Sequence, residues 1–466
     1  MRASRVLAVL CAAQFMVVAD DTIVNVALPS VRADLGLEAS ELAWVVDAYL
    51  LLFGGFLLVG GRAADLLGRR RMFLIGTGLF TLVSLLCGLA ADEGQLIAAR
   101  GAQGLAGALL SPAALSLLLS TFPEGEGRTR ALGMWGAIMG LAGGSGVLLG
   151  GVVSELLGWR WVFLVNVPLG LAILVAARRV VPPGAAARRG SLDLPGAALV
   201  TGGLLVALYA VMETRTHGWT SAHTLVGLGA GAALLALFAL HESRAAEPLL
   251  PPALLRRRAA LAAFGLIGLG AAALFAMFFF VSLYMQAVQG WGPLRAGASW
   301  LPFTAALLVT SGVVLQVLPG RPLRPFLAVG ALVIAGGFVL LAQLEPGDAY
   351  LTALVPAMVA MGVGIGVLMV PMTAAATAGV GPELAGLASG LVTTFQQIGG
   401  AVGLAVLVTV ASDRTAGLLG EGQPAGEAAV GGYASAFWVA FGLSVAAAAV
   451  ASTLGPLRAP RDVVIA

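Results

Sequence analysis

The chain has 466 residues, of which 59% are hydrophobic and 11% are charged, and its mean hydropathy is +0.98. This composition argues against a soluble globular domain and indicates a protein whose surroundings are mostly lipid. The absence of lysine excludes a phosphate-loop lysine for ATP and Schiff-base chemistry, and the net charge of +3 reflects arginines beside apolar segments rather than a patch for nucleic acid.

Apolar segments of membrane-spanning length recur along the whole chain. A helix that crosses a hydrocarbon core of about 30 Å needs roughly 18–25 apolar residues. Fourteen segments meet this requirement, with approximate boundaries 6–28, 42–60, 72–91, 95–121, 131–153, 160–177, 194–212, 223–241, 260–285, 297–318, 325–343, 350–373, 386–411 and 433–454. We therefore predict an all-α membrane protein with 14 transmembrane helices.

The arginines alternate between the gaps that separate these segments. Of the 26 arginines, 20 fall in every second gap, five fall in the other gaps, and Arg100 lies inside a segment. Because cytoplasmic loops are enriched in arginine, the pattern predicts a multi-pass protein of the cell membrane with both termini in the cytoplasm. Only five residues precede the first segment, so we expect that segment to act as the insertion signal rather than as a cleaved signal peptide.

An internal repeat divides the chain into two related halves. At a constant offset of 259 residues, Gly61-Arg62 recurs as Gly320-Arg321, Pro112 as Pro371, and Pro123-Glu124 as Pro382-Glu383. Repeated bundles of this kind bind cargo between them. The repeat predicts a six-helix bundle over 1–182, a linker with two inserted helices over 183–258, a second six-helix bundle over 259–455 and a cytoplasmic tail over 456–466.

Small residues follow a four-residue spacing in the fifth segment. They are Gly136, Gly140 and Gly144, followed by Gly146 with the pair Gly150 and Gly151. Glycines at this spacing allow two helix backbones to approach closely inside a membrane. The ladder serves either static packing or a sliding seam between moving halves.

Four charged residues lie inside the segments of the first bundle, namely Asp20, Asp21, Asp47 and Arg100. Charges at such positions are costly and are functional candidates. From the helical rise, Asp20 and Arg100 lie at a similar depth. An acid whose distance to an arginine changes can bind and release a proton; the alternative is a permanent, structural ion pair.

The sequence alone does not decide which of the two neighbouring aspartates binds the proton. Gln14, Asp21 and Asn25 lie within about 60° of one another around the helix, which favours Asp21. In the fourth segment Arg100 and Gln103 begin a polar stripe that continues through Gly104, Gly107 and Ser111. We expect Gln14, Asn25 and Gln103 to line a path that water or substrate can reach.

Several motifs resemble those of a known family. Gly61-Arg-Ala-Ala-Asp65-Leu-Leu-Gly68-Arg69-Arg70-Arg71 resembles the signature loop of the major facilitator superfamily, and Ala19 to Pro29 resembles the first-helix motif of its fourteen-helix drug:proton antiporters. Arg100 to Gly104, Trp159 to Gly170 and Gly386 to Gly390 are similar to further motifs of that family. The resemblance extends from about residue 10 to about residue 410.

The resemblance implies a major facilitator fold that works by alternating access. It implies proton-driven export of hydrophobic or amphipathic drugs, antibiotics or secondary metabolites, with no cofactor besides the proton gradient. By position it assigns the proton to Asp20, its release to Arg100, and a cytoplasmic gate to Gly61, Asp65, Gly68 and Arg69. Where the family has Gly-Pro-x-x-Gly-Gly in the fifth helix, this chain has Gly146-Val-Leu-Leu-Gly150-Gly151 without the proline, which weakens the inference of export.

Aromatic residues of the ninth segment are candidates for substrate lining. We expect Phe275, Phe279 and Tyr284 to contribute to an adaptable apolar site. Because Phe278 to Phe280 point in three directions, some of them should face lipid. Trp44, Tyr49, Trp291 and Trp300 are expected to be interfacial belt residues rather than ligands.

The sequence leaves several alternatives to drug export. The three histidines show no metal-ligand spacing, so no metal site is predicted. A proton-coupled metabolite importer is the main alternative, although the second bundle offers few polar residues. A membrane enzyme lacks a catalytic constellation, and a non-transporting sensor is a further option. The expected partners are small organic substrates, protons and the lipid bilayer, and the protein is expected to be a monomer.

Overall fold

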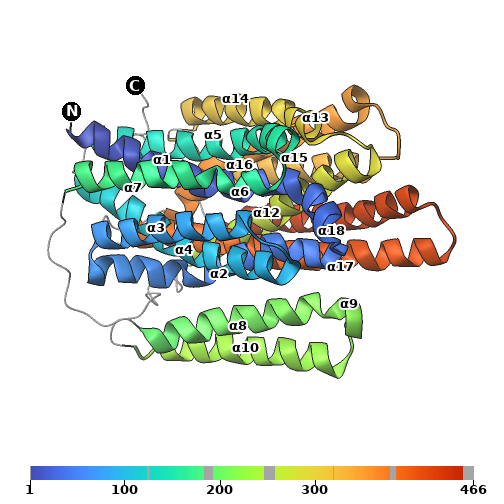
Figure 1. Ribbon diagram of the computed structural model, residues 1–466, viewed down its shortest axis with the longest axis horizontal. Coiled ribbons are helices and arrows are strands. Elements are labelled where there is room, and N and C mark those ends of the chain that lie inside the picture. The colour runs from blue at the N-terminus through green and yellow to red at the C-terminus, as the bar shows by residue number, and fades with distance from the viewer. Residues whose placement is uncertain are drawn as a thin grey trace. The chain divides into compact units, whose positions relative to one another are not determined.

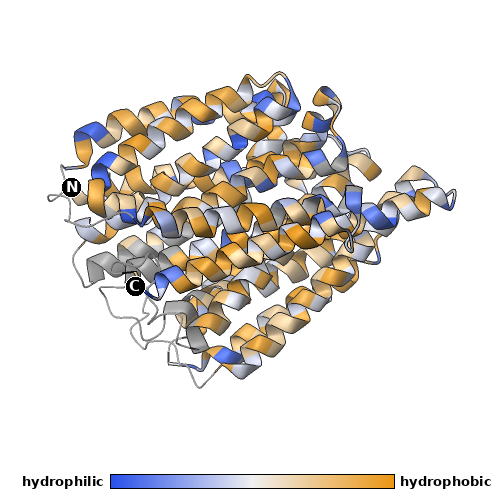
Figure 2. Cartoon of the chain, turned by 90° about the horizontal axis from the view of Figure 1, so that it is seen from below, coloured by the Kyte–Doolittle hydropathy of each residue, from blue (hydrophilic) through white to orange (hydrophobic). Residues whose placement is uncertain are grey.

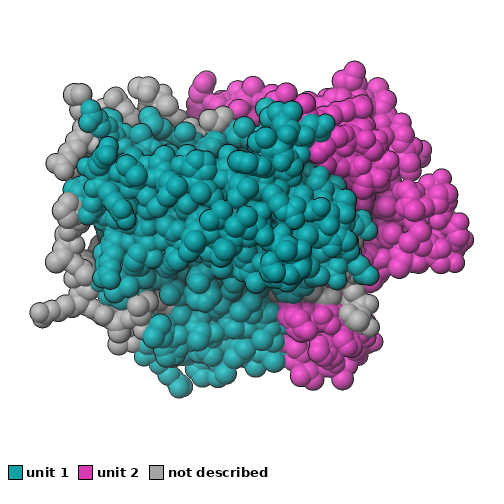
Figure 3. Space-filling view, in the orientation of Figure 1, with its two compact units in different colours: residues 1–207, 229–252, 382–394 teal, residues 208–228, 253–381, 395–466 magenta. Residues whose placement is uncertain are grey.

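The computed structural model describes residues 2–122, 126–182, 193–245, 258–318, 320–377 and 385–454, and some side chains within those helices are not described. Every regular element of the described part is a helix, as Figure 1 shows. The chain forms two compact units, Met1–Ala207 with Gly229–Pro252 and Pro382–Thr394, and Leu208–Leu228 with Ala253–Gly381 and Phe395–Ala466 (Figure 3). The predicted tail 456–466 and residues 183–192 and 246–257 of the predicted linker lie outside the described residues.

The first unit contains the helices of the predicted N-terminal bundle. They are α1 (Arg2–Leu35), α2 (Ala39–Leu67), α3 (Arg69–Gly88), α4 (Glu93–Thr121), α5 (Glu126–Leu157), α6 (Arg160–Leu164) and α7 (Asn166–Val180). Helix α4 packs against both α2 and α3, and α1 packs against α5. This arrangement places α4 at the centre of its neighbours, where a polar residue is shielded from lipid.

The second unit is built from α12 (Arg258–Leu283), η1 (Tyr284–Val288), α13 (Pro293–Ala298), α14 (Leu301–Val317), α15 (Leu323–Leu341), η2 (Tyr350–Leu354), α16 (Val355–Thr377), α17 (Ala385–Gly420) and α18 (Ala425–Thr453). Helix α16 packs against α14 and α15, and α18 packs against α12 and α15. The short π-helices η1 and η2 extend α12 and precede α16, respectively.

The predicted inserted pair forms a hairpin of α8 (Leu194–Met212) and α10 (Ala222–Glu242), joined by the single turn α9 (Thr214–His217). A Cβ on Gly231 would lie 2.9 Å from the Ala207 nitrogen, so the two helices approach closely. The Thr201 hydroxyl of α8 donates a hydrogen bond of 2.9 Å to the Gly55 carbonyl of α2. The part of α8 that belongs to the first unit is therefore attached to α2 by a buried polar contact.

Twelve helices of the described part are long and apolar enough to cross a membrane, which makes the chain a multi-pass membrane protein. Figure 2 shows the hydrophobic colouring that runs along most of these helices. The two predicted spans that are not among the twelve, 42–60 and 131–153, fall within α2 and α5, which contain 29 and 32 residues. The count of 14 therefore remains a prediction.

Glycine shapes the contact between α2 and α4. A Cβ on Gly104 would fall on the Tyr49 carbonyl, and a Cβ on Gly60 would fall on the Ala108 carbonyl. Since backbone atoms are the obstacle, no side-chain rotation can relieve either contact. The close approach of the two backbones depends on both glycines.

Replacement of Gly104 by alanine should therefore destabilise the first unit by about 1–3 kcal/mol, because α2 and α4 must separate. The measurement is the thermal unfolding temperature of the purified protein in detergent. Gly78→Ala in α3 is the matched control, because a Cβ there meets nothing within 4 Å. Equal unfolding temperatures for the two variants would contradict the packing argument.

Candidate functional site

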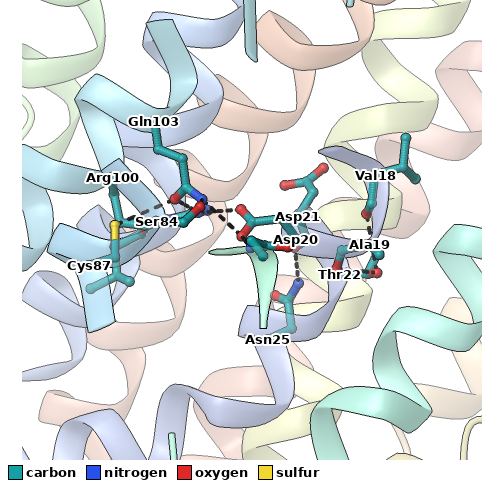
Figure 4. A network of polar contacts seen from close by, with 12 residues as sticks. Val18, Ala19, Asp20, Asp21, Thr22, Asn25, Ser84, Cys87, Arg100 and Gln103 are labelled. Atoms are coloured by element: carbon teal, nitrogen blue, oxygen red, sulfur yellow. Dashed lines mark hydrogen bonds and ion pairs between the residues drawn. The ribbon is translucent and has the colours of Figure 1, made fainter. Parts of the chain in front are cut away.

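A buried ion pair joins α1 to α4 in the first unit. Arg100 Nη1 lies 2.7 Å from Asp20 Oδ2, and both side chains have no solvent exposure. Burial of two charges is costly, and such a pair persists only where other polar groups complete it. The surrounding contacts, shown in Figure 4, satisfy this requirement.

Two amides complete the coordination of the Asp20 carboxylate. Gln103 Nε2 donates to Asp20 Oδ1 at 2.9 Å, and Asn166 Nδ2 of α7 donates to the same oxygen at 2.6 Å. Together with Arg100, three donors point at the two oxygens. An ionised carboxylate only accepts hydrogen bonds, so this environment matches its ionised form.

Gln103 connects the pair to α3. Its Nε2 also donates to Ser84 Oγ at 2.8 Å, while its Oε1 accepts from Arg100 Nη1 at 2.7 Å and from Cys87 Sγ at 3.5 Å. Both ends of the amide are therefore occupied. The network extends over α1, α3, α4 and α7, and a change at Asp20 reaches all four helices.

The Arg100 guanidinium is fixed by further contacts. Its Nε donates to the Val45 carbonyl of α2 at 3.0 Å. Its central carbon lies 4.3 Å from the Tyr49 ring centroid and 5.7 Å from that of Phe163. Cation–π contacts of this kind stabilise a desolvated guanidinium. Nη2 alone has no hydrogen-bonding partner among the described residues.

Asp21 has different surroundings from Asp20. Asp21 is half-buried, and its Oδ1 has no partner among the described residues. Asn25 donates to the Asp21 backbone carbonyl at 3.0 Å rather than to its carboxylate, and Gln14 accepts a hydrogen bond of 2.8 Å from Ser111. The structure thus brings Asp20, and not Asp21, to Arg100.

Asp47 of α2 is a second fully buried acid of this unit. Neither of its carboxylate oxygens has a hydrogen-bonding partner among the described residues. The sequence indicates Asp47 as an interior charge without a role. Ser84 and Asn166 were not predicted as partners of the pair, although Asn166 is a polar residue inside an apolar segment and could have been found on that basis.

The predicted cytoplasmic gate lies at the turn between α2 and α3. Gly68 has a φ of +97° and links the two helices, which explains why glycine occupies this position. Arg69 Nη1 donates to the Ser116 carbonyl of α4 at 3.5 Å. A Cβ on Gly61 would lie 3.7 Å from Pro112, and the Asp65 side chain lies outside the described residues.

The described part of the predicted glycine ladder packs against α1 beside the ion pair. A Cβ on Gly146 would fall on Thr22 Oγ1, and a Cβ on Gly150 would lie 2.7 Å from the Ile23 carbonyl. Gly151 is also buried. The surroundings of Gly140 and Gly144 lie outside the described residues.

The predicted substrate-lining residues of the second unit are packed in its interior. Phe275 lies against Gly400, Phe279 is 1% exposed, and the Tyr284 hydroxyl donates to the Glu345 carbonyl at 2.7 Å. Their contact with a substrate remains a prediction.

Two expectations for aromatic residues were wrong. None of Phe278, Phe279 and Phe280 faces lipid, because each is at most 8% exposed. Phe278 packs on Trp300 with centroids 4.6 Å apart, and Phe280 packs on Phe437 at 5.9 Å. Tyr49 and Trp300 are each 1% exposed and are interior residues rather than belt residues.

Membrane-length helices around a fully buried and hydrogen-bonded ion pair define a polytopic membrane protein with a candidate functional site in its interior. The family model described as Major Facilitator Superfamily matches residues 10–404. The chain therefore belongs to the major facilitator superfamily, whose members are transporters and not enzymes.

The chain is similar to a resistance protein and to an export protein, each from a bacterium. It is 41% identical to the puromycin resistance protein of Streptomyces alboniger, with 94% of this chain and 88% of that protein covered. It is 43% identical to the cephamycin export protein of Amycolatopsis lactamdurans, with 89% and 86% covered. The crystal structure of a bacterial homologue of the human lysosomal transporter Spinster superposes with a TM-score of 0.68 at 15% identity over 97% of this chain and 96% of that one, which shows the shared fold.

The ion pair yields a stability prediction. Arg100→Met should destabilise the protein by about 3–5 kcal/mol, because the carboxylate is left without its charged partner. In Asp20→Asn/Arg100→Met most of this loss should be recovered. Thermal unfolding of the two single variants and the double variant in detergent measures the coupling. Strictly additive losses would show that the two side chains do not act as a pair.

Proposed function

We propose that this protein is a proton-coupled antiporter that exports antibiotics, secondary metabolites or similar amphipathic compounds. Two relatives support the cargo class, since one is named for resistance to puromycin and the other for export of cephamycin. Proton coupling rests on the ion pair between Asp20 and Arg100. This buried carboxylate is the one observation on which the mechanism depends.

Protonation of Asp20 is incompatible with its present hydrogen bonds. The three donors around the carboxylate come from Arg100, Gln103 and Asn166. A protonated acid carries a hydrogen on one oxygen, which then faces donors instead of accepting from them. The Gln103 carbonyl already accepts hydrogen bonds from Arg100 and from Cys87. A proton therefore loosens the connection between α1, α4 and α7.

The energy of the ion pair is comparable with the energy that a conformational change requires. Breaking one partner of a buried ion pair costs about 3–5 kcal/mol. Reversal of a two-state population from 1:99 to 99:1 requires about 5.5 kcal/mol. Loss of this single pair therefore supplies most of the bias needed between two access states, and substrate binding can supply the remainder.

The remaining parts of the proposal follow from position. The arginine pattern supports a protein of the cell membrane with both termini in the cytoplasm, so the turn with Gly61, Gly68 and Arg69 belongs to the cytoplasmic gate. Asp65 belongs to the same gate by its motif. The glycines of α5 that lie against α1 allow the helix carrying Asp20 to slide without clashes. The transporter works as a monomer.

Asp20→Asn tests the coupling directly. The variant should insert and fold but should not exchange protons for cargo, because asparagine has no titratable proton. In energised inside-out vesicles that contain the unaltered protein, puromycin should dissipate part of the proton gradient, as reported by a pH-sensitive dye. This response should be lost in the variant.

Asp21→Asn is the matched control, since Asp21 does not contact Arg100 in the structure. It should retain most of the puromycin-dependent proton flux. If Asp20→Asn still exchanges protons and Asp21→Asn does not, the coupling residue is Asp21. If puromycin increases the proton gradient of the vesicles instead of dissipating it, the protein is a symporter.

A further inference from the structure

The turn between α8 and α10 brings together two histidines and one glutamate. One nitrogen of His217, one nitrogen of His223 and one carboxylate oxygen of Glu213 all lie within 4.8 Å of one another. The chain has three histidines in total, so two of them meet at this turn. The proton exchange proposed for the ion pair of the first unit gives these residues no role.

The distances suit a tetrahedral metal ion. Zinc bonds to histidine nitrogen at about 2.0–2.1 Å, which separates neighbouring ligand atoms by about 3.3 Å. Glu213 Oε2 and His217 Nδ1 already lie 3.3 Å apart. The His223 ring stacks on the His217 ring with centroids 4.5 Å apart and an angle of 20° between the planes. The ligand nitrogen of His223 lies within 4.8 Å of the other two ligand atoms, and the exposed His223 side chain must move closer to them to bind the same ion.

The backbone around the three residues is held by its own hydrogen bonds. Gly218, at a φ of +81°, donates to the Thr214 carbonyl at 2.6 Å. The buried Thr224 hydroxyl donates to the Gly218 carbonyl at 2.9 Å, and its amide donates to Ser221 Oγ at 3.2 Å. These bonds connect the end of α9 to the start of α10. A frame fixed in this way keeps ligands in register without a bound ion.

Solvent can reach the ligands. His217 and His223 are exposed, and Glu213 is partly exposed. An ion can therefore enter directly, and water can complete the coordination. Two imidazoles and one carboxylate favour zinc and similar transition metals over Mg²⁺ and Ca²⁺, which prefer oxygen ligands alone.

We propose that Glu213, His217 and His223 form a binding site for a divalent transition-metal ion of the Zn²⁺ type. The ion fixes the end of the inserted hairpin by linking α9 to α10. This role is independent of the proton exchange proposed for Asp20.

Titration calorimetry with Zn²⁺ alone tests the site on the full-length protein in detergent, purified without a histidine tag. The unaltered protein should bind one equivalent of Zn²⁺ saturably and should show no comparable binding of Mg²⁺. His217→Ala and His223→Ala should each weaken Zn²⁺ binding at least about ten-fold. The milder Glu213→Gln should weaken Zn²⁺ binding by a smaller factor.

His241→Ala is the matched control. It removes the third histidine, whose Nε2 lies 2.7 Å from Asp193 Oδ1 next to the start of α8, and it should leave Zn²⁺ binding unchanged. Thermal unfolding without metal checks that each variant is folded. If a variant does not fold, Co²⁺ binding to the unaltered protein provides a second measurement. A visible absorption band typical of tetrahedral Co²⁺, which disappears when Zn²⁺ is added, supports the site.

Two outcomes overturn the proposal. One is the absence of saturable Zn²⁺ binding and of a tetrahedral Co²⁺ band in the unaltered protein. The other is unchanged Zn²⁺ affinity in the folded double variant His217→Ala/His223→Ala. In either case Glu213 and His217 form only a surface pair of the kind that stabilises a helix turn. Neither result bears on the antiporter mechanism, which the vesicle assay tests separately.

Discussion

The desolvated carboxylate of Asp20 is the constraint around which the first unit is organised. A charge that is removed from water requires an opposite charge and a full set of donors, and here these come from two other helices. Arg100 and Gln103 project from α4, Asn166 projects from α7, and Ser84 of α3 holds the amide of Gln103. The position of each helix relative to α1 is thereby specified by polar contacts, whereas apolar packing alone would tolerate sliding.

The glycines give this network its geometry. Side chains as short as those of aspartate and asparagine meet across helices only where the backbones are close. Gly104 brings α4 against α2 at the level of Tyr49, whose ring faces Arg100. Gly146 and Gly150 bring α5 against α1 next to Asp20. The glycines therefore set the distances between the helices that the contacts of the charged residues require.

The sequence predicted the membrane class and most helices, because apolar length and arginine placement are local signals. The family was predicted from the resemblance of several motifs. Motif position also indicated Asp20, whereas the helical wheel indicated Asp21. The helical wheel did not identify the residue that contacts Arg100, because a wheel shows the polar face of one helix but not which neighbouring helix that face contacts. The burial of Phe280 and the pairing of His217 with His223 depend on contacts between helices or across a turn, which no spacing in one segment encodes.

The contact between Thr201 and Gly55 bears on how the inserted hairpin is related to the rest of the protein. If α8 were removed, the Gly55 carbonyl would lose the hydrogen bond from Thr201. The Gly55 backbone would also lose its cover, because the Thr201 methyl group now lies 3.2 Å from the position of a Cβ on Gly55. Lipid chains can fill such a notch only poorly. Deletion of α8 and α10 would consequently leave an unfilled depression on the surface of α2, and a larger residue at position 55 would be needed to fill it.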